Sequence, residues 1–204
     1  MTKKLLIIAA AVNLLVACGN EPAPVEEPVV DFAAEAARIA ASSIIIDTHI
    51  DVPYRLDATP EDVSQATAKG DFDYPRAVRG GLNAPFMSIY TPAGLEAEGR
   101  SKEVADKLID SVEAIVAGAP EKFAVALSTA DLQAQFEAGI MSLPMGMENG
   151  SPIEGDLENL KHFYDRGIRY VTPAHSKSNH LSDCLLYTSD AADDNRVVLV
   201  SGGG

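Results

Sequence analysis

Apolar runs alternate with amphipathic stretches along most of the chain. The first run is Ile44, Ile45 and Ile46, and because polar positions do not interrupt it, we predict a strand that is buried on both faces. The pattern predicts further strands at 80–90, 123–127, 140–147 and 168–173. Apolar residues at helical spacing predict helices at 31–43, 101–118, 129–137 (capped by Thr129) and 157–165. Strands that alternate with helices in this way indicate an α/β fold with a parallel sheet.

Polar residues follow the first apolar run directly. Side chains alternate along a strand, so Asp47, His49 and Asp51 are predicted to point to the same side. One imidazole and two carboxylates at one spot are the beginning of a metal site. The alternative is a strand that ends in polar residues only because it reaches solvent. Paired Gly80 and Gly81 predict a close approach of the backbone to another group.

Two other predicted strands also end in residues that carry chemistry. Glu148 follows the apolar stretch 140–147, and His175 follows 168–173. The carboxyl ends of the strands are where a (β/α)8 barrel carries its active site. Each residue has a simpler interpretation, since Glu148 could be a surface or helix-capping carboxylate and His175 a hydrogen-bonded loop histidine. Together with His49 and Asp51 they form a candidate ligand set.

The N-terminal segment has the composition of a targeting signal. Residues 1–17 combine two early lysines with an apolar run and lead into Cys18, which resembles a bacterial lipoprotein signal. This predicts lipidation of Cys18 and a place on the extracytoplasmic side of the bacterial cell envelope. A plain secretory signal or an uncleaved anchor is the alternative. Residues 18–30 are acidic and proline-rich, which predicts a disordered tether.

Charge and cysteine content narrow the class of protein further. The formal net charge is −14, and no basic stripe is present, so nucleic acid is excluded as a partner. Apart from Cys18 the only cysteine is Cys184. With Cys18 lipidated, no internal disulfide can form, and the fold must depend on packing.

Four stretches, taken in order, resemble successive motifs of the membrane dipeptidase family, also called renal dipeptidase-like metallopeptidases. The resemblance runs from about residue 44 to residue 183, and the motifs are DTHIDVP (47–53), GGLNAPFMSIY (80–90), GMENG (146–150) and LKHFYDRGIRYVTPAHSKSNHLSD (160–183).

This resemblance implies a (β/α)8 TIM barrel of the metal-dependent amidohydrolase type with two Zn²⁺ ions. His49 and Asp51 would bind the first zinc, and Glu148 would bridge both. Asp47 would orient a ligand, and His175 would hold the scissile carbonyl of the substrate. The implied reaction is hydrolysis of a dipeptide by a metal-bridging hydroxide. The protein would be anchored to the membrane through the lipid on Cys18, and the complete protein would be able to form a homodimer.

The resemblance stops after Asp183. No histidine lies beyond His180, so the two histidines that would complete the second zinc site, and a late acidic residue, are missing. We therefore interpret residues 31–183 as the N-terminal half of the barrel. Residues 184–204 resemble a translated sequencing adapter, which predicts a non-biological tail, with a divergent natural terminus as the alternative. The chain as written is predicted to be inactive and poorly folded, because a half barrel exposes sheet edges.

Two rival functions stay open. One is another hydrolase or a deaminase on the amidohydrolase fold, against which the motif at Glu148 argues. The other is a non-catalytic barrel lipoprotein that serves as a binding module. His162 on a helix face and His180 in a loop are predicted to be structural rather than metal ligands.

Overall fold

The computed structural model describes residues 30–184. The expected leader at 1–17, the lipid site at Cys18, the tether up to residue 29 and the expected tail from residue 185 lie outside the described residues. The described elements, in chain order, are α1 (Phe32–Ala41), β1 (Ile46–Ile50), α2 (Val52–Ala58), α3 (Tyr74–Gly80), β2 (Ala84–Tyr90), α4 (Gly94–Ala97), α5 (Ser101–Gly118), β3 (Phe123–Ala124), α6 (Thr129–Glu137), β4 (Met141–Ser142), β5 (Met145–Glu148), the 3₁₀ turn η1 (Ser151–Ile153), α7 (Leu157–Asp165) and β6 (Ile168–Thr172). Within 30–184, no helix has the length and apolar character needed to cross a membrane.

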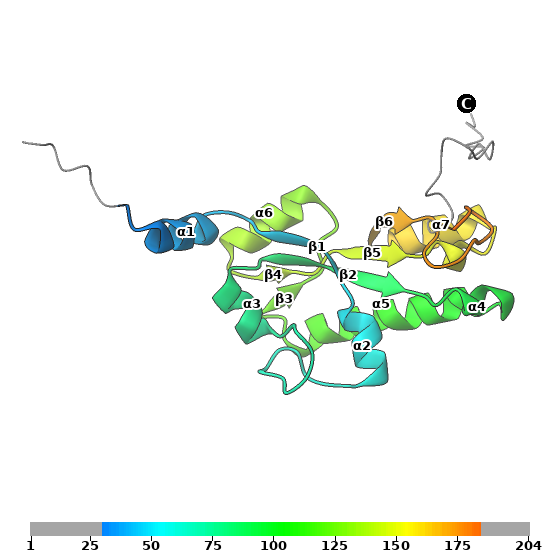
Figure 1. The fold of residues 1–204 in the computed structure, drawn as a ribbon, viewed down its shortest axis with the longest axis horizontal. Coiled ribbons are helices and arrows are strands. Elements are labelled where there is room, and N and C mark those ends of the chain that lie inside the picture. The colour runs from blue at the N-terminus through cyan, green and yellow to red at the C-terminus, as the bar shows by residue number, and fades with distance from the viewer. Residues whose placement is uncertain (1–29, 185–204) are drawn as a thin grey trace, which may run out of the picture.

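A four-stranded sheet lies at the centre of the molecule, with the order β1-β2-β5-β6 and every neighbouring pair parallel. In Figure 1, α2, α3 and α5 lie on one side of this sheet. Parallel neighbours need a crossover connection, and the helices between the strands supply it. The parallel sheet predicted from the alternating pattern is confirmed. Its strands all end at one edge, which is where the polar motifs lie.

β1 is an edge strand whose residues are mostly exposed, and this exposure shows that the prediction of burial on both faces is wrong. Among the described residues it pairs with β2 alone. Ile46 keeps 43% of its surface exposed, and only Ile50 of this strand is half-buried. β-branched side chains suit a pleated, half-buried surface, which an edge strand also offers. The β-branched run does not indicate whether another strand hydrogen-bonds to the second edge of β1.

The apolar stretch at 140–147 forms two short strands instead of one. Pro144 lies between them, and because proline has no N–H it interrupts the ladder. β4 consequently pairs with β3, whereas β5 pairs with β2 and β6. The Pro144 carbonyl still accepts the N–H of Met87 at 2.8 Å, which holds β5 in register with β2. This register places Glu148, at the end of β5, beside Tyr90 at the end of β2.

The core lies between the sheet and α5. Leu108, Ile109 and Val112 of α5 are at most 1% exposed, as the helical spacing predicted. The strands contribute Met87, Met141, Met145 and Met147, each at most 4% exposed. Methionine is unbranched and fills irregular space between a twisted sheet and a helix. The site at the edge of the sheet therefore rests on a closely packed base.

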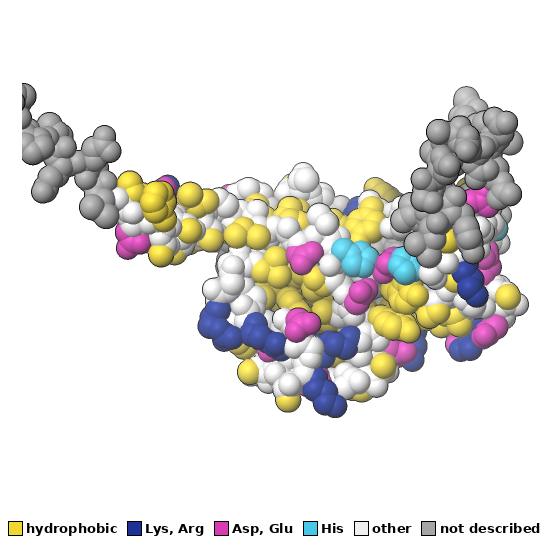
Figure 2. Space-filling model, viewed as in Figure 1, with side chains coloured by type: hydrophobic (Ala, Val, Ile, Leu, Met, Phe, Trp, Pro, Cys, Tyr) yellow, Lys and Arg dark blue, Asp and Glu magenta, His cyan; other side chains and the backbone are white. Residues whose placement is uncertain are grey.

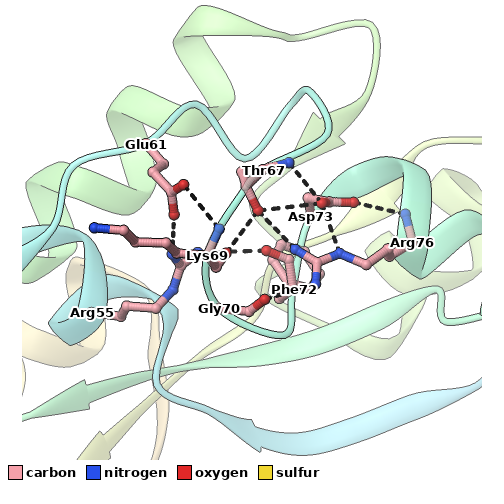
Figure 3. A network of polar contacts seen from close by, with 8 residues as sticks. All are labelled: Arg55, Glu61, Thr67, Lys69, Gly70, Phe72, Asp73 and Arg76. Carbon is pink, nitrogen blue, oxygen red and sulfur yellow. Dashed lines mark hydrogen bonds and ion pairs between the residues drawn. The ribbon is translucent and has the colours of Figure 1, made fainter.

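The apolar pattern predicted neither α2 nor α3, and the polar segment 59–73 joins them (Figure 3). The guanidinium of Arg55 donates to Glu61 Oε2 at 2.5 Å, and Glu61 Oε1 accepts the N–H of Lys69. A Cβ built at Gly70 would lie 2.5 Å from the guanidinium carbon of Arg55, and Gly70 has a φ of 68°, so glycine lets the loop close over this side chain without strain. Because α2 begins directly after Asp51, this clamp holds the helix that follows the candidate site.

Asp73 forms the second half of the same network (Figure 3) and caps α3. Its carboxylate accepts the N–H of Thr67 at 2.9 Å, the N–H of Arg76 at 2.8 Å and the Nε–H of Arg76 at 2.8 Å. The hydrogen bond from Thr67 contributes most to lowering the pKa of Asp73 to about 2, and the Arg76 contacts lower it further, against burial. Asp73 is 1% exposed, and these hydrogen bonds keep its carboxylate ionised inside the fold against the opposing effect of burial.

Gly80 and Gly81 do not mark a close approach, contrary to the prediction. Gly80 is the last residue of α3, and no atom lies within 4 Å of a Cβ built there. Gly81 has a φ of 77° and ends the helix in the left-handed conformation. A Cβ at Gly81 would lie 3.4 Å from Ala40 Cβ, which is ordinary contact. The second glycine is needed because the helix ends there with positive φ.

Two helices differ in detail from the predictions. α1 forms where it was expected, but it stands apart from the sheet (Figure 1) and none of its residues is buried. α6 is capped by Ser128 instead of Thr129, because the Ser128 hydroxyl accepts the N–H of Asp131 at 3.1 Å. Thr129 is then the first helical residue, which is a one-residue shift of the helix start.

Candidate metal centre

The candidate ligands come from two strands at the carboxyl edge of the sheet. His49 is the penultimate residue of β1, and Glu148 is the last residue of β5. Asp51 follows β1 and stands at the N-cap position of α2, where its side chain makes no capping hydrogen bond. Its carboxylate oxygens are therefore available to the site.

Three side chains converge at this edge. His49 Nε2 lies 3.1 Å from Glu148 Oε2 and 3.5 Å from Asp51 Oδ1. One ligand atom from each of the three residues lies within 4.8 Å of the other two. Figure 2 shows histidine and acidic side chains together in the middle of this face. If β1 ended in polar residues only because it reaches solvent, there would be no reason for Glu148, two strands away in the sheet, to contact the imidazole of His49.

The donor set fits a zinc-type ion. Imidazole nitrogen and carboxylate oxygen are both zinc ligands, with bonds of about 2 Å. In a tetrahedral shell with such bonds, ligand atoms lie about 3.3 Å from one another. The distances from His49 Nε2 to Glu148 and Asp51 bracket that value. Two carboxylates beside one imidazole also leave an excess of negative charge, which favours a cation.

The carboxylate of Glu148 lies between two imidazoles. Its Oε1 is 3.0 Å from His175 Nε2, and its Oε2 is the oxygen that faces His49. The hydroxyl of Ser88 on β2 donates to the same Oε2 at 3.0 Å, and Ser88 is 0% exposed. Each oxygen of Glu148 thus faces the imidazole nitrogen of a different histidine, so the two oxygens are available to two different partners, as in a bridging carboxylate. Sequence reasoning missed Ser88.

Asp47 does not belong to this group, so the predicted convergence of Asp47, His49 and Asp51 is wrong in one member. The register of β1 against β2 is irregular between Asp47 and Ile50, and the strict alternation of side chains fails there. Asp47 Oδ1 instead accepts the backbone N–H of His49 at 3.0 Å. Asp47 therefore supports the backbone at a ligand, and the second carboxylate of the site is Glu148.

His175 lies in the segment after β6 and presents Nε2 to the site. Its ring meets the Tyr90 ring edge-on, with centroids 5.2 Å apart. Its Nδ1 is buried and has no hydrogen-bond partner among the described residues. Nε2, opposite Glu148 Oε1, is therefore the nitrogen that can exchange a proton or a hydrogen bond with a ligand in the site.

Tyr170 of β6 is a site residue that sequence reasoning missed. Its hydroxyl lies 3.2 Å from His49 Nδ1 and 3.1 Å from the Thr48 carbonyl oxygen. Burial, followed by the negative charge of Glu148, raises the pKa of Tyr170, so the phenol stays protonated. A signal was present in the sequence, since Gly146 interrupts the apolar residues of β5 opposite Tyr170. Glycine inside a strand often marks the close approach of another group.

The two residues after Glu148 join the loops that follow β5 and β6. Asn149 has a φ of 72° and is 1% exposed. Its Nδ2 donates to the Thr91 carbonyl at 2.8 Å, and its Oδ1 accepts from Asn179 Nδ2 at 2.8 Å. Gly150 lies so close to the next loop that a Cβ there would be 3.0 Å from the Pro173 carbonyl oxygen. Asparagine tolerates the left-handed conformation better than most residues, which explains its place here.

The remaining two histidines lie outside this group of ligands. His162 Nε2 lies 2.7 Å from Asp106 Oδ1, and this hydrogen bond fastens α7 to α5. His180 Nδ1 lies 2.7 Å from Glu96 Oε1, and the backbone N–H of His180 donates to the same oxygen at 3.0 Å. Both contacts join one segment to another, which agrees with the structural role predicted for these histidines.

Comparison with known proteins identifies the relatives of this chain. The family described as Membrane dipeptidase (Peptidase family M19) matches residues 33–203. Dipeptidase ataJ of Aspergillus terreus is 26% identical over 151 residues, which are 68% of this chain and 37% of that protein. A metallopeptidase of Rhodobacter sphaeroides, solved with a phosphinate mimic of the dipeptide L-Ala-D-Ala, is 25% identical with a TM-score of 0.60 over 66% of this chain and 46% of its own.

A third relative shares the fold at lower identity. The probable dipeptidase PvdM of Pseudomonas aeruginosa has a TM-score of 0.63 at 22% identity, over 73% of this chain and 39% of its own. The chain thus spans less than half the length of each of these relatives. The range that the family matches includes positions 184–203. A non-biological origin of these positions stays a prediction, which resequencing of the genomic locus tests.

Proposed function

This chain belongs to the membrane dipeptidase family of metallopeptidases, and on that premise we propose that it carries one side of a dizinc dipeptidase active site. The observation that carries the proposal is the convergence of His49, Asp51 and Glu148 at the carboxyl edge of a parallel sheet. Dipeptide hydrolysis is the activity named for relatives that match 65–68% of this chain. For the fold, we propose that the sheet is the first part of a (β/α)8 barrel of the amidohydrolase type.

Each residue has a role that its position supports. His49 and Asp51 would hold the first ion, and Glu148 would serve as a ligand to both ions. The hydroxyl of Ser88 donates a hydrogen bond to Oε2 of Glu148 and helps to hold this carboxylate in place. No histidine follows His180 in the chain. We therefore assign the remaining ligands of the second ion to the part of the relatives that this chain does not span.

The chemistry follows from the ions and from His175. Zinc bound at such a site acidifies a water molecule and polarises a carbonyl group. The chain itself supplies His175, whose Nε2 faces the site 3.0 Å from Glu148 Oε1. We propose that the N–H at Nε2 donates a hydrogen bond to the carbonyl oxygen of the scissile amide. This hydrogen bond stabilises the negative charge that develops on the oxygen during attack. Tyr90, packed edge-on against the ring, keeps this imidazole in place.

The substrate class and the location are part of the same proposal. The phosphinate in the Rhodobacter sphaeroides relative mimics the dipeptide L-Ala-D-Ala, so a dipeptide is the substrate that we propose here. We also propose that a lipid on Cys18 holds the protein on the outer side of a bacterial membrane, which rests on the sequence of residues 1–18. Mass spectrometry of the mature N-terminus tests this lipid directly.

The experiment uses the product of the complete reading frame that contains this chain. Hydrolysis of L-Ala-D-Ala is measured with the zinc content for the wild type, Glu148→Gln and the matched control Glu121→Gln, because Glu121 is exposed. We expect two zinc ions in the wild type. Substitutions around a metal ligand reduce activity by at most roughly 100-fold, and we expect Glu148→Gln to reduce turnover by more than that. Glu121→Gln should behave as the wild type.

The outcomes separate the rival functions. Zinc uptake without turnover of any dipeptide would favour a binding module, and turnover of a cyclic amide or an amino-substituted base alone would favour another hydrolase or a deaminase. Full activity of Glu148→Gln would refute the proposed site. The 204-residue chain alone is expected to show no turnover, because the second ion lacks its histidine ligands.

A further inference from the structure

The nitrogen of His49 that faces away from the site has its own partner. Nδ1 lies 3.2 Å from the hydroxyl of Tyr170, and the same hydroxyl lies 3.1 Å from the carbonyl oxygen of Thr48. Nε2 of the same ring is the atom that faces Glu148 and Asp51. The two ring nitrogens thus meet different chemistry, with a phenol on one side and two carboxylates on the other.

Counting protons fixes the direction of both contacts. A carbonyl oxygen can only accept, and a phenol has one proton, so the Tyr170 hydroxyl donates to Thr48. If the hydroxyl also bonds to His49, its oxygen must accept a proton that Nδ1 carries. The lone pair of the neutral imidazole then stands on Nε2, at the point where the carboxylates converge.

We infer that Tyr170 is a positioning residue, which holds His49 in the Nδ1–H tautomer and so presents the Nε2 lone pair to the metal. This inference rests on the proposed metal site. Tyr170 itself does not bind the ion, since its hydroxyl meets the ring on the side away from the carboxylates. A hydrogen bond to the second nitrogen of a ligating histidine generally fixes its tautomer and ring orientation.

The fold provides a path for this contact across the sheet. Tyr170 belongs to β6 and His49 to β1, which are the two outer strands of the sheet, so the side chain must pass over β5 and β2. It passes over β5 at Gly146, where a Cβ would lie 2.0 Å from the ring carbon Cζ. Beyond Gly146 the ring packs beside Phe86 of β2, with centroids 5.4 Å apart. The absence of a side chain at position 146 is thus what lets the hydroxyl reach the metal ligand.

The test separates the hydroxyl from the ring. Tyr170→Phe keeps the ring over Gly146 and removes the hydroxyl alone, and Tyr164→Phe removes a hydroxyl from a side chain that is 60% exposed. In the product of the complete reading frame, zinc is removed by a chelator and returned in competition with a chromophoric chelator. We expect about 10-fold weaker zinc binding in Tyr170→Phe, as is usual for such an outer partner, and no change in Tyr164→Phe.

A second measurement needs no variant at the tyrosine. Long-range ¹H–¹⁵N correlation spectra of the zinc-loaded wild type should show His49 with zinc on Nε2 and a proton on Nδ1, the signal being assigned by its loss in His49→Ala. Zinc on Nδ1, or undiminished zinc affinity in Tyr170→Phe, would overturn the inference. If Tyr170→Phe fails to fold, the spectrum of the wild type still decides. A wild type that takes up no zinc would overturn the metal site as well, whereas a variant that binds as tightly as the wild type refutes the role of Tyr170 alone.

Discussion

Asn149 offers a test of how the loop after Glu148 is held. In Asn149→Ala, two hydrogen bonds of 2.8 Å are lost, one to the buried Thr91 carbonyl and one from Asn179. Each contributes about 1 kcal/mol to the free energy of unfolding. Alanine at a φ of 72° costs about 1 kcal/mol more, because it lacks the polar side chain that supports the left-handed conformation by accepting the N–H of Ser151 at 3.3 Å. The expected loss of stability is therefore about 3 kcal/mol.

The matched control is Asn159→Ala. Asn159 lies in the ordinary helix α7 and donates a single hydrogen bond of 3.1 Å, to the Ile153 carbonyl. Its loss should cost about 1 kcal/mol or less. Urea denaturation of the metal-free protein measures both variants, with the m-value checked for constancy. If Asn149→Ala is no less stable than Asn159→Ala, neither the left-handed backbone at Asn149 nor its bridging amide contributes the expected free energy of unfolding. A weaker zinc affinity in Asn149→Ala would show that the loop also orients Glu148.

Two more predictions concern buried polar side chains. The hydrogen bonds of Asp73 lower its pKa to about 2, below the value of about 3.9 in an unfolded chain. The stability that the ionised carboxylate contributes is therefore present above about pH 4 and is lost as the pH falls from about 4 to 2. Asp73→Asn should flatten the denaturation profile over that interval, whereas Asp71→Asn, at an exposed position, should leave it unchanged. Ser88→Ala removes the hydroxyl that holds Glu148 and should weaken zinc binding about 10-fold in a chelator competition. Ser111→Ala removes a hydroxyl from α5 and serves as the control, and an equal effect of this variant would refute a specific role of Ser88.

Local patterns in the sequence were sufficient for the secondary structure of the core. The helix α5 runs over the predicted residues 101–118, because its apolar face is repeated every three or four residues. The helices at 129–137 and 157–165 also lie at the predicted residues. The pattern failed at two places in particular. Pro144 divides a single apolar stretch into β4 and β5, and the left-handed Gly81 ends a helix that the pattern did not contain.

The candidate site was predictable in part. Glu148 and His175 were selected because they follow apolar strands, and the structure brings both to the edge that holds His49. Asp47 was placed by strict alternation, and the irregular register of β1 removed it from the group. Ser88 carried no signal beyond its place in an apolar strand, and the signal for Tyr170 was a glycine in another strand, Gly146 of β5. Their contacts depend on which strands are neighbours, and that information is not local.

The sequence by itself determined the α/β class, the parallel sheet and the edge at which chemistry collects, because hydrophobic periodicity and strand ends are properties of short segments. Only the tertiary structure decided that β1 is an edge strand, that Glu148 lies between His49 and His175, and that Tyr170 reaches across Gly146 to the first of these histidines. Those relations depend on strand order and on side-chain directions across four strands, which no single stretch of the chain contains.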